Sequence, residues 1–202
     1  LTLTIAGDSN NYLINIDDNG DVNGHTLIMT QTGITADVDV VQSGSYDNIA
    51  TVTTTGDSQN LDINQTAGGT ITLVSTGSTA SAVKTININQ TGHAVFTTAG
   101  DGLNGAGGSF DIDQTSTGTI SLDQNGASAN VSVNQTGTGT ITLDLDGASG
   151  TYDIDSLNNS TITLTQDGAS ANYNILQTGG SGDTLIMTQN GASADVDIIQ
   201  RD

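Results

Sequence analysis

Carboxylates, amides and hydroxyls make up almost all of the reactive side chains in this sequence. All 22 acidic residues are aspartates, there is no cysteine, and the two histidines, His25 and His93, lie far apart in the chain. The aspartates recur in pairs along the whole length and do not gather in one segment. A general acid needs a water-poor pocket that raises its pKa, and a repeated surface pattern forms no such pocket. We therefore predict that the chain is not an enzyme and has no catalytic residues.

The paired aspartates suggest one binding chemistry, because Ca²⁺ prefers oxygen ligands. The candidate ligands are Asp37, Asp39, Asp111, Asp113, Asp153, Asp155, Asp195 and Asp197. The segment 179–185 also resembles a single calcium-binding nonapeptide repeat, but no EF-hand loop is present. The other interpretation, which we favour, is a solvated acidic face that keeps molecules apart. We predict no cofactor, with Ca²⁺ on this face as the alternative.

The composition and charge exclude several kinds of partner. The 202 residues include only two basic ones, Lys84 and Arg201, and the formal net charge is −20. A nucleic-acid binder needs a basic surface that displaces counterions, so we predict no nucleic-acid partner. A membrane span needs about 18 or more consecutive apolar residues, and because none is present we predict no membrane insertion. The abundance of Thr, Val, Ile, Asn, Asp and Gly, without Pro or Glu, favours strands and turns over helices.

An internal repeat organises the chain. The segment 26–42 returns almost unchanged at 184–200, and related units recur at intervals of 21–26 residues. We expect nine such units in one domain, 1–202, without a linker. The units end near Ile16, Gln42, Gln65, Gln90, Gln114, Gln135, Ser156, Gln177 and Gln200.

Glutamine and glycine hold fixed places in the unit. In the cleanest units two glutamines lie eleven residues apart, and a glycine follows the first of them by two residues. The first glutamines are Gln31, Gln124, Gln166 and Gln189, and the glycines are Gly33, Gly126, Gly168 and Gly191. Elsewhere we expect Ile5, Thr54, Ser75, Thr98 and Leu145 in place of the first glutamine. A glycine in the arc can adopt the positive φ that we expect a tight arc to require.

The segments around the glutamines alternate between apolar and polar residues with period two, which indicates strands. The first strand has pairs such as Leu27 and Met29, and the second has pairs such as Val38 and Val40. Each glutamine continues the apolar side of the alternation, so we expect it to point inward. Stacked glutamine amides can donate to one neighbouring rung and accept from the other, which satisfies a buried polar row.

Two short strands bury too little apolar surface to fold alone, so the units must stack. We predict an all-β fold, a β-solenoid of nine strand–arc–strand rungs with two parallel, in-register sheets face to face. Inward glutamine ladders should run along it. The longer segments 75–90 and 98–114 are expected to form bulged arcs at one edge.

The Gln-x-Gly…Ala…Gln unit resembles the curlin repeat of curli fibre subunits, over essentially the whole chain. The best matching positions are Gln31, Gly33, Ala36 and Gln42, with Gln124, Gly126, Ala129 and Gln135, Gln166, Gly168, Ala171 and Gln177, and Gln189, Gly191, Ala194 and Gln200. The resemblance implies an extracellular functional amyloid that is secreted unfolded and nucleated at the cell surface. Its partners would be further copies of itself, a nucleator subunit and outer-membrane secretion machinery.

The residues themselves also favour assembly. The sequence reads as whole rungs with bare strand edges at both ends, and bare edges template further pairing. We therefore predict a structural subunit of an extracellular, curli-like fibre that grows by end-to-end stacking, with a role in biofilm matrix or adhesion. The alternatives are an ice-binding or adhesin module that uses a flat threonine face, and a repeat segment of a larger surface or phage fibre protein. The threonine face is interrupted at Ile28, Val74, Asp123, Asp144 and Ile186.

Overall fold

The computed structural model describes residues 1–17, 24–44, 48–66, 68–76, 83–92, 94–104, 107–115, 117–125, 128–146 and 149–201. Predictions made for His93 and Gly126 fall outside these residues, as do parts of the two longer segments, 77–82 and 105–106. The described chain consists of strands and short connections, with no helix, and the predicted all-β solenoid is confirmed.

The first strands of the rungs form one nine-stranded sheet, and the second strands form another. Strands of the first sheet, in spatial order, are β1 Thr2–Ala6, β3 Thr26–Thr32, β5 Asn48–Thr55, β7 Gly69–Thr76, β9 Ala94–Asn104, β11 Gly118–Gln124, β13 Gly139–Leu145, β15 Ser160–Gln166 and β17 Thr184–Gln189. Strands of the second sheet are β2 Asn10–Asp17, β4 Thr35–Ser43, β6 Ser58–Gln65, β8 Val83–Thr91, β10 Gly107–Thr115, β12 Ser128–Thr136, β14 Ser149–Leu157, β16 Ser170–Thr178 and β18 Ser193–Arg201.

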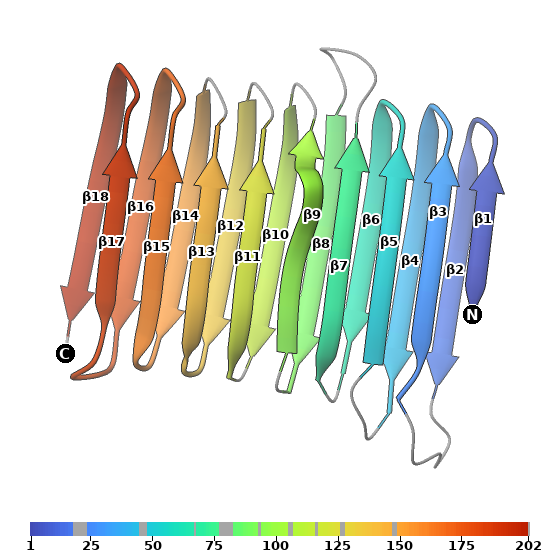
Figure 1. Cartoon of the computed structure of the whole chain (residues 1–202), viewed down its shortest axis with the longest axis horizontal. Helices are drawn as coiled ribbons and strands as arrows, with labels where there is room; N and C mark the ends of the chain where they lie inside the picture. Colours follow the sequence, from blue (N-terminus) through green and yellow to red (C-terminus); the bar gives the residue numbers. More distant parts are fainter. Residues whose placement is uncertain are drawn as a thin grey trace.

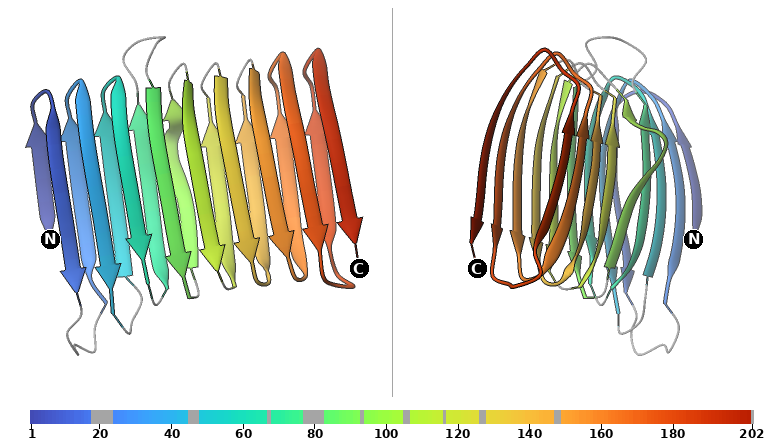
Figure 2. Two further views of the ribbon diagram at one scale, coloured as in Figure 1. Left: turned by 180° about the vertical axis from the view of Figure 1, so that it is seen from behind. Right: turned by 60° about the vertical axis from the view of Figure 1, so that its left-hand side comes forward.

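Each strand pairs in parallel with the strand two positions away in the chain, so the rungs follow one another along a single axis (Figure 1). The two chain ends lie at opposite ends of that axis, and the sheets twist gently between them (Figure 2). The residues predicted to end the rungs form one continuous column of Cα partners from Ile16 to Gln200. The hydrophobic period and the glutamine spacing therefore predicted the register of the second sheet.

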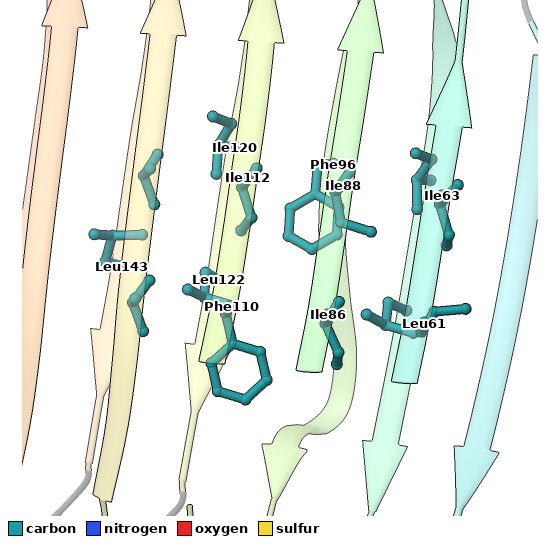
Figure 3. Close-up of a cluster of buried hydrophobic side chains, with 14 of the residues drawn as sticks. Leu61, Ile63, Ile86, Ile88, Phe96, Phe110, Ile112, Ile120, Leu122 and Leu143 are labelled. Carbon is teal, nitrogen blue, oxygen red and sulfur yellow. The ribbon is translucent and has the colours of Figure 1, made fainter. Parts of the chain in front are cut away.

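The core lies between the two sheets and is filled by the inward side of each alternation (Figure 3). In the rung of β5 and β6, for example, Val52 and Ile63 have no more than 1% of their surface exposed. The two stacked tyrosines, Tyr152 and Tyr173, extend this packing with ring centroids 4.8 Å apart and planes 13° apart. Burial raises the pKa of Tyr152 to about 12, so the ring stays neutral in the core. Two strands of the first sheet, β5 and β9, have a less regular apolar alternation in the sequence. Their inward positions are occupied by Ala50, Val52 and Phe96, which are buried.

One prediction about the first sheet is wrong. Thr98 was expected at the position of the first glutamine, but it pairs with Leu73, two residues earlier in the strand pattern. Leu103 occupies the predicted position, opposite Ser75 on one side and Gln124 on the other. The extra residues therefore form a bulge inside β9 rather than only a longer arc. A bulge preserves the pairing on both sides of itself, so the periodic pattern alone did not reveal it.

The reason predicted for the arc glycines is also wrong. Gly33, Gly168 and Gly191 do not have positive φ. Gly33 is required for a different reason, because a Cβ there would stand 1.9 Å from the carbonyl oxygen of Gly7 in the preceding rung. Gly191 has the same relation to Gly168, at 1.8 Å. The arcs thus stack too closely for a side chain at these positions.

We expect Gly33→Ala to destabilise the fold by about 1–3 kcal/mol, the usual cost of forcing extra volume into packed structure. Gly182→Ala is the matched control, because the nearest atom to a Cβ there is 3.6 Å away, an ordinary contact. Urea unfolding followed by circular dichroism measures both. Equal midpoints for the two variants would contradict this account of the arc.

Candidate functional site

The second sheet contains the predicted glutamine ladder. Gln65 donates from Nε2 to Oε1 of Gln42 at 3.2 Å, and Gln90 donates to Gln65 at 3.0 Å. Gln114 donates to Gln90, Gln135 to Gln114, and Gln200 to Gln177, at 3.4, 2.7 and 3.3 Å. The ladder has a direction, because in each of these bonds the amide donates toward the N-terminal rung.

Most of these amides also donate to a backbone carbonyl oxygen of the facing first sheet. Gln65 Nε2 lies 3.0 Å from the carbonyl oxygen of Asn48, and Gln135 Nε2 lies 3.2 Å from that of Gly118. The ladder glutamines of the interior rungs are buried, each with no more than 1% of its surface exposed. The ladder therefore joins the two sheets at one edge of the core as well as joining successive rungs.

Ser156 interrupts the ladder. Its hydroxyl bonds to Ser160 rather than to the rung before it. Oε1 of Gln135 is consequently buried without a hydrogen-bond partner. Gln177 starts a new segment by donating to the carbonyl oxygen of Ser160 at 2.6 Å. A ladder glutamine followed by a rung without a donor is thus left with an unsatisfied acceptor.

The glutamines of the first sheet do not repeat this ladder. Both amide atoms of Gln31 are buried without a partner, since its column neighbours are Ile5 and Thr54. Gln166 donates to the carbonyl oxygen of Gly168 at 2.6 Å instead of to another glutamine. Gln124 accepts from the hydroxyl of Tyr152 at 3.4 Å, and Gln189 is exposed on the last rung. The prediction that these residues point inward is right within the stack, but the hydrogen-bonded ladder belongs to the second sheet.

We expect Gln90→Met to destabilise the fold by about 1–3 kcal/mol, because it leaves Oε1 of Gln65 buried without a donor. Methionine keeps the length and flexibility of the side chain. Gln189→Met makes the same change at an exposed position and should leave the urea midpoint almost unchanged. If both variants unfolded at the same urea concentration, the ladder would not contribute to stability.

The outer face of the second sheet carries the aspartates that were candidate calcium ligands. Seven of the eight have no aspartate directly opposite them in an adjacent rung: Asp37, Asp111, Asp113, Asp153, Asp155, Asp195 and Asp197. Their neighbours are mostly asparagines, and amide donors bind the carboxylates directly. Asn60 donates to Asp37 at 2.7 Å, and Asn174 donates to Asp153 at 2.9 Å. The alternation of Asn with Asp keeps like charges apart along the axis.

Asp39 is the exception, because it lies opposite Asp62. Partial burial, together with the charges of Asp37 and Asp62, raises the pKa of Asp39. Burial and neighbouring aspartates also raise the pKa of Asp146 and of Asp155. These carboxylates are the places where the acidic surface opposes folding.

The described residues contain no group of three or more His, Asp, Glu or Cys side chains arranged to hold a metal ion. In the nonapeptide-like segment, Asp183 instead accepts a hydrogen bond from the backbone N–H of Ser160 at 2.8 Å. An open groove of about 770 Å³ runs across the starts of the second-sheet strands from β10 to β18. Its lining is mainly Gly, Ala, Ser, Asn and Thr.

Acidification should stabilise the folded chain. The folded-state pKa values of Asp39, Asp146 and Asp155 lie above the ordinary value of 3.8, so the folded state binds protons more tightly than the unfolded state. The stability that these three carboxyl groups contribute is complete below pH 3.8, and it is lost as the pH rises through their raised pKa values. Urea midpoints measured between pH 7 and 4 should rise as the pH falls. The variant with all three changed to Asn should show a flatter dependence, and a midpoint that fell on acidification would contradict the prediction.

The outer face of the first sheet carries threonines in two adjacent columns. Over three successive rungs these columns read Thr119 and Ser121, Thr140 and Thr142, and Thr161 and Thr163. Outside these rungs the columns include Ile28, Ile49, Val95 and Ile186. The regular threonine surface therefore covers about a third of the face.

The two end rungs present unpaired strands and exposed apolar side chains. At the C-terminal end, Ile198 is 48% exposed and Ile199 41% exposed, beside the open edge of β18. At the N-terminal end, Leu1 is 65% exposed and Leu13 is 72% exposed. Ile198 is the Cα partner of the core residue Ile175, which is fully buried in its own rung. Ile199 and Leu13 lie instead in outer-face columns, beside Leu176 and Asp39.

No protein-family model, curated protein or solved structure matches this chain. Among the described residues, no helix is long and apolar enough to cross a membrane.

Proposed function

We propose that the chain is a structural subunit of an extracellular fibre, which grows when the last rung of one copy stacks on the first rung of the next. The observation that supports this most directly is a sequence identity between strands. The residues 184–189 of β17 are identical to residues 26–31 of β3, the strand that pairs with β1 inside the chain. A second copy would therefore offer the open edge of β1 a strand with the same side chains as β3, the partner on its other edge.

The register of this junction follows from the register inside the chain. Leu3 and Ile5 are the Cα partners of Met29 and Gln31, so in the junction they would lie beside Met187 and Gln189 of the other copy. The N–H and C=O of Leu1 bond to β3, and backbone directions alternate along a strand. The groups of Thr2 and Thr4 then point to the open edge and are available to β17.

The second sheet continues in the same way. The 193–200 segment of β18 differs only conservatively from the 35–42 segment of β4, which pairs with β2. In the corresponding register Val196 lies beside Tyr12 and Ile198 beside Ile14, which buries the exposed apolar side chains of both ends. Asp195 lies opposite Asn11 and Asp197 opposite Leu13. No aspartate of the second sheet then faces another across the junction.

The junction is weaker than an interior contact at one position. Gln200 would lie opposite Ile16, which has no donor, so Oε1 of Gln200 would be buried without a partner. Gln135 before Ser156 is the same arrangement inside the chain. We therefore expect subunits to separate at junctions before rungs separate within a subunit.

The extracellular setting, a nucleator and a secretion machinery belong to this proposal through the resemblance to curlin repeats. The acidic surface supports it as well, because a net charge of −20 per subunit keeps neighbouring fibres apart in solution. A matrix or adhesive role fits a chain whose interior is wholly used in stacking.

Electron microscopy and sedimentation of the purified chain test the proposal. We expect unbranched filaments with an axial repeat of about 4.8 Å between strands. Ile198→Lys should abolish filaments, because it places a charge beside Ile14 in the closed junction, while the exposed position in the monomer tolerates the change.

Ile28→Lys is the matched control. Ile28 is 45% exposed, close to the 48% of Ile198, but it lies on the outer threonine face and one rung inside the junction. This variant should still form filaments. A wild-type chain that stayed monomeric at high concentration, or filaments unaffected by Ile198→Lys, would contradict end-to-end stacking.

A further inference from the structure

Two charged residues at opposite ends of the solenoid occupy the same column of the second sheet. Asp17 is the Cα partner of Ser43 in the first two rungs, and Arg201 is the Cα partner of Thr178 in the last two. We propose that Arg201 of one copy pairs with Asp17 of the next, and that this ion pair sets the register and polarity of the fibre. This inference rests on the proposed function.

The position of Arg201 is unusual for this chain. It is one of only two basic residues in a chain with a net charge of −20. The interior members of its column include Ser43, Thr91, Thr136 and Thr178, which are neutral. This column therefore has a cation at one end of the solenoid and an anion at the other. End-to-end stacking of two copies in the register of the interior strands would bring these charges together.

The local geometry suits the pair. Ser43 donates its hydroxyl to Oδ1 of Asp17 at 2.7 Å, from the side of the next rung. The incoming rung would approach from the other side, about 4.8 Å away, which an arginine guanidinium spans easily. The backbone of Arg201 is already fixed, because its carbonyl oxygen accepts from the N–H of Gly179 at 3.0 Å.

The pair also selects one register. A slip of one residue would turn every apolar side chain of the joining strand to the outer face. A slip of two residues keeps the faces but moves Arg201 away from Asp17, to a position opposite Asn15 or beyond the end of β2. Among registers that keep the apolar side chains inside, only the unslipped one joins the cation to the anion.

Charge reversal tests the pair, with the critical concentration for assembly measured by sedimentation at low salt. Arg201→Asp and Asp17→Arg should each raise the critical concentration by about fivefold or more, since each places like charges opposite each other. The double variant restores opposite charges in the reverse order and keeps the net charge, so it should return to within about twofold of wild type. High salt should reduce the defect of each single variant.

Asp111→Arg is the control for net charge, because it changes the total by the same amount as Asp17→Arg but lies in an interior rung. It should lower the critical concentration by reducing repulsion between copies. The ion pair would be contradicted if Asp17→Arg lowered the critical concentration as much as Asp111→Arg does, or if the double variant assembled no better than the single variants. Neither result would contradict stacking itself. Failure of the wild type to assemble would overturn both stacking and the pair.

Discussion

Backbone pairing between rungs is the constraint on which the rest of this structure depends. Among the described strands, none pairs with the strand that follows it in the chain, and each interior strand bonds instead to the rung before and the rung after. A single rung can therefore satisfy neither its backbone groups nor its apolar side chains. Repetition is then required for folding, and the repeat period of the sequence reflects that requirement.

Stacking in register places similar side chains directly above one another, and the chain handles three kinds of side chain differently. Apolar columns pack to form the core. The buried glutamines of the second sheet bond to each other, since an amide both donates and accepts. Aspartates repel their own kind, and on the outer face they mostly stand next to asparagine, serine or threonine. That separation fails where Asp39 lies opposite Asp62, and burial together with the charges of Asp37 and Asp62 raises the pKa of Asp39.

The same constraint makes the ends of the solenoid different from its interior. The edges of β1, β2, β17 and β18 lack a neighbour, and residues that would be core elsewhere are exposed there. The last rung nearly repeats the sequence of the second rung, and this repetition is the basis of the proposed stacking of copies. Assembly of copies would extend an interaction that the chain uses between all its own rungs, at a junction with a weaker glutamine contact and one complementary pair of charges.

The sequence by itself determined the fold class, the inward positions and the register of the second sheet, because a period of two and a repeat of 21–26 residues allow few other arrangements. It did not determine the position of Leu103, because a bulge shifts residues without changing the pattern on either side of it. It also predicted a ladder for Gln31 and Gln166 that did not form, since hydrogen bonding depends on the residues stacked above and below. The requirement for glycine at Gly33 came from the distance to Gly7 and not from its own backbone angles. Side-chain contacts between residues 20 or more positions apart depend on how the rungs align, and only the tertiary structure showed the hydrogen bond from Ser43 to Asp17.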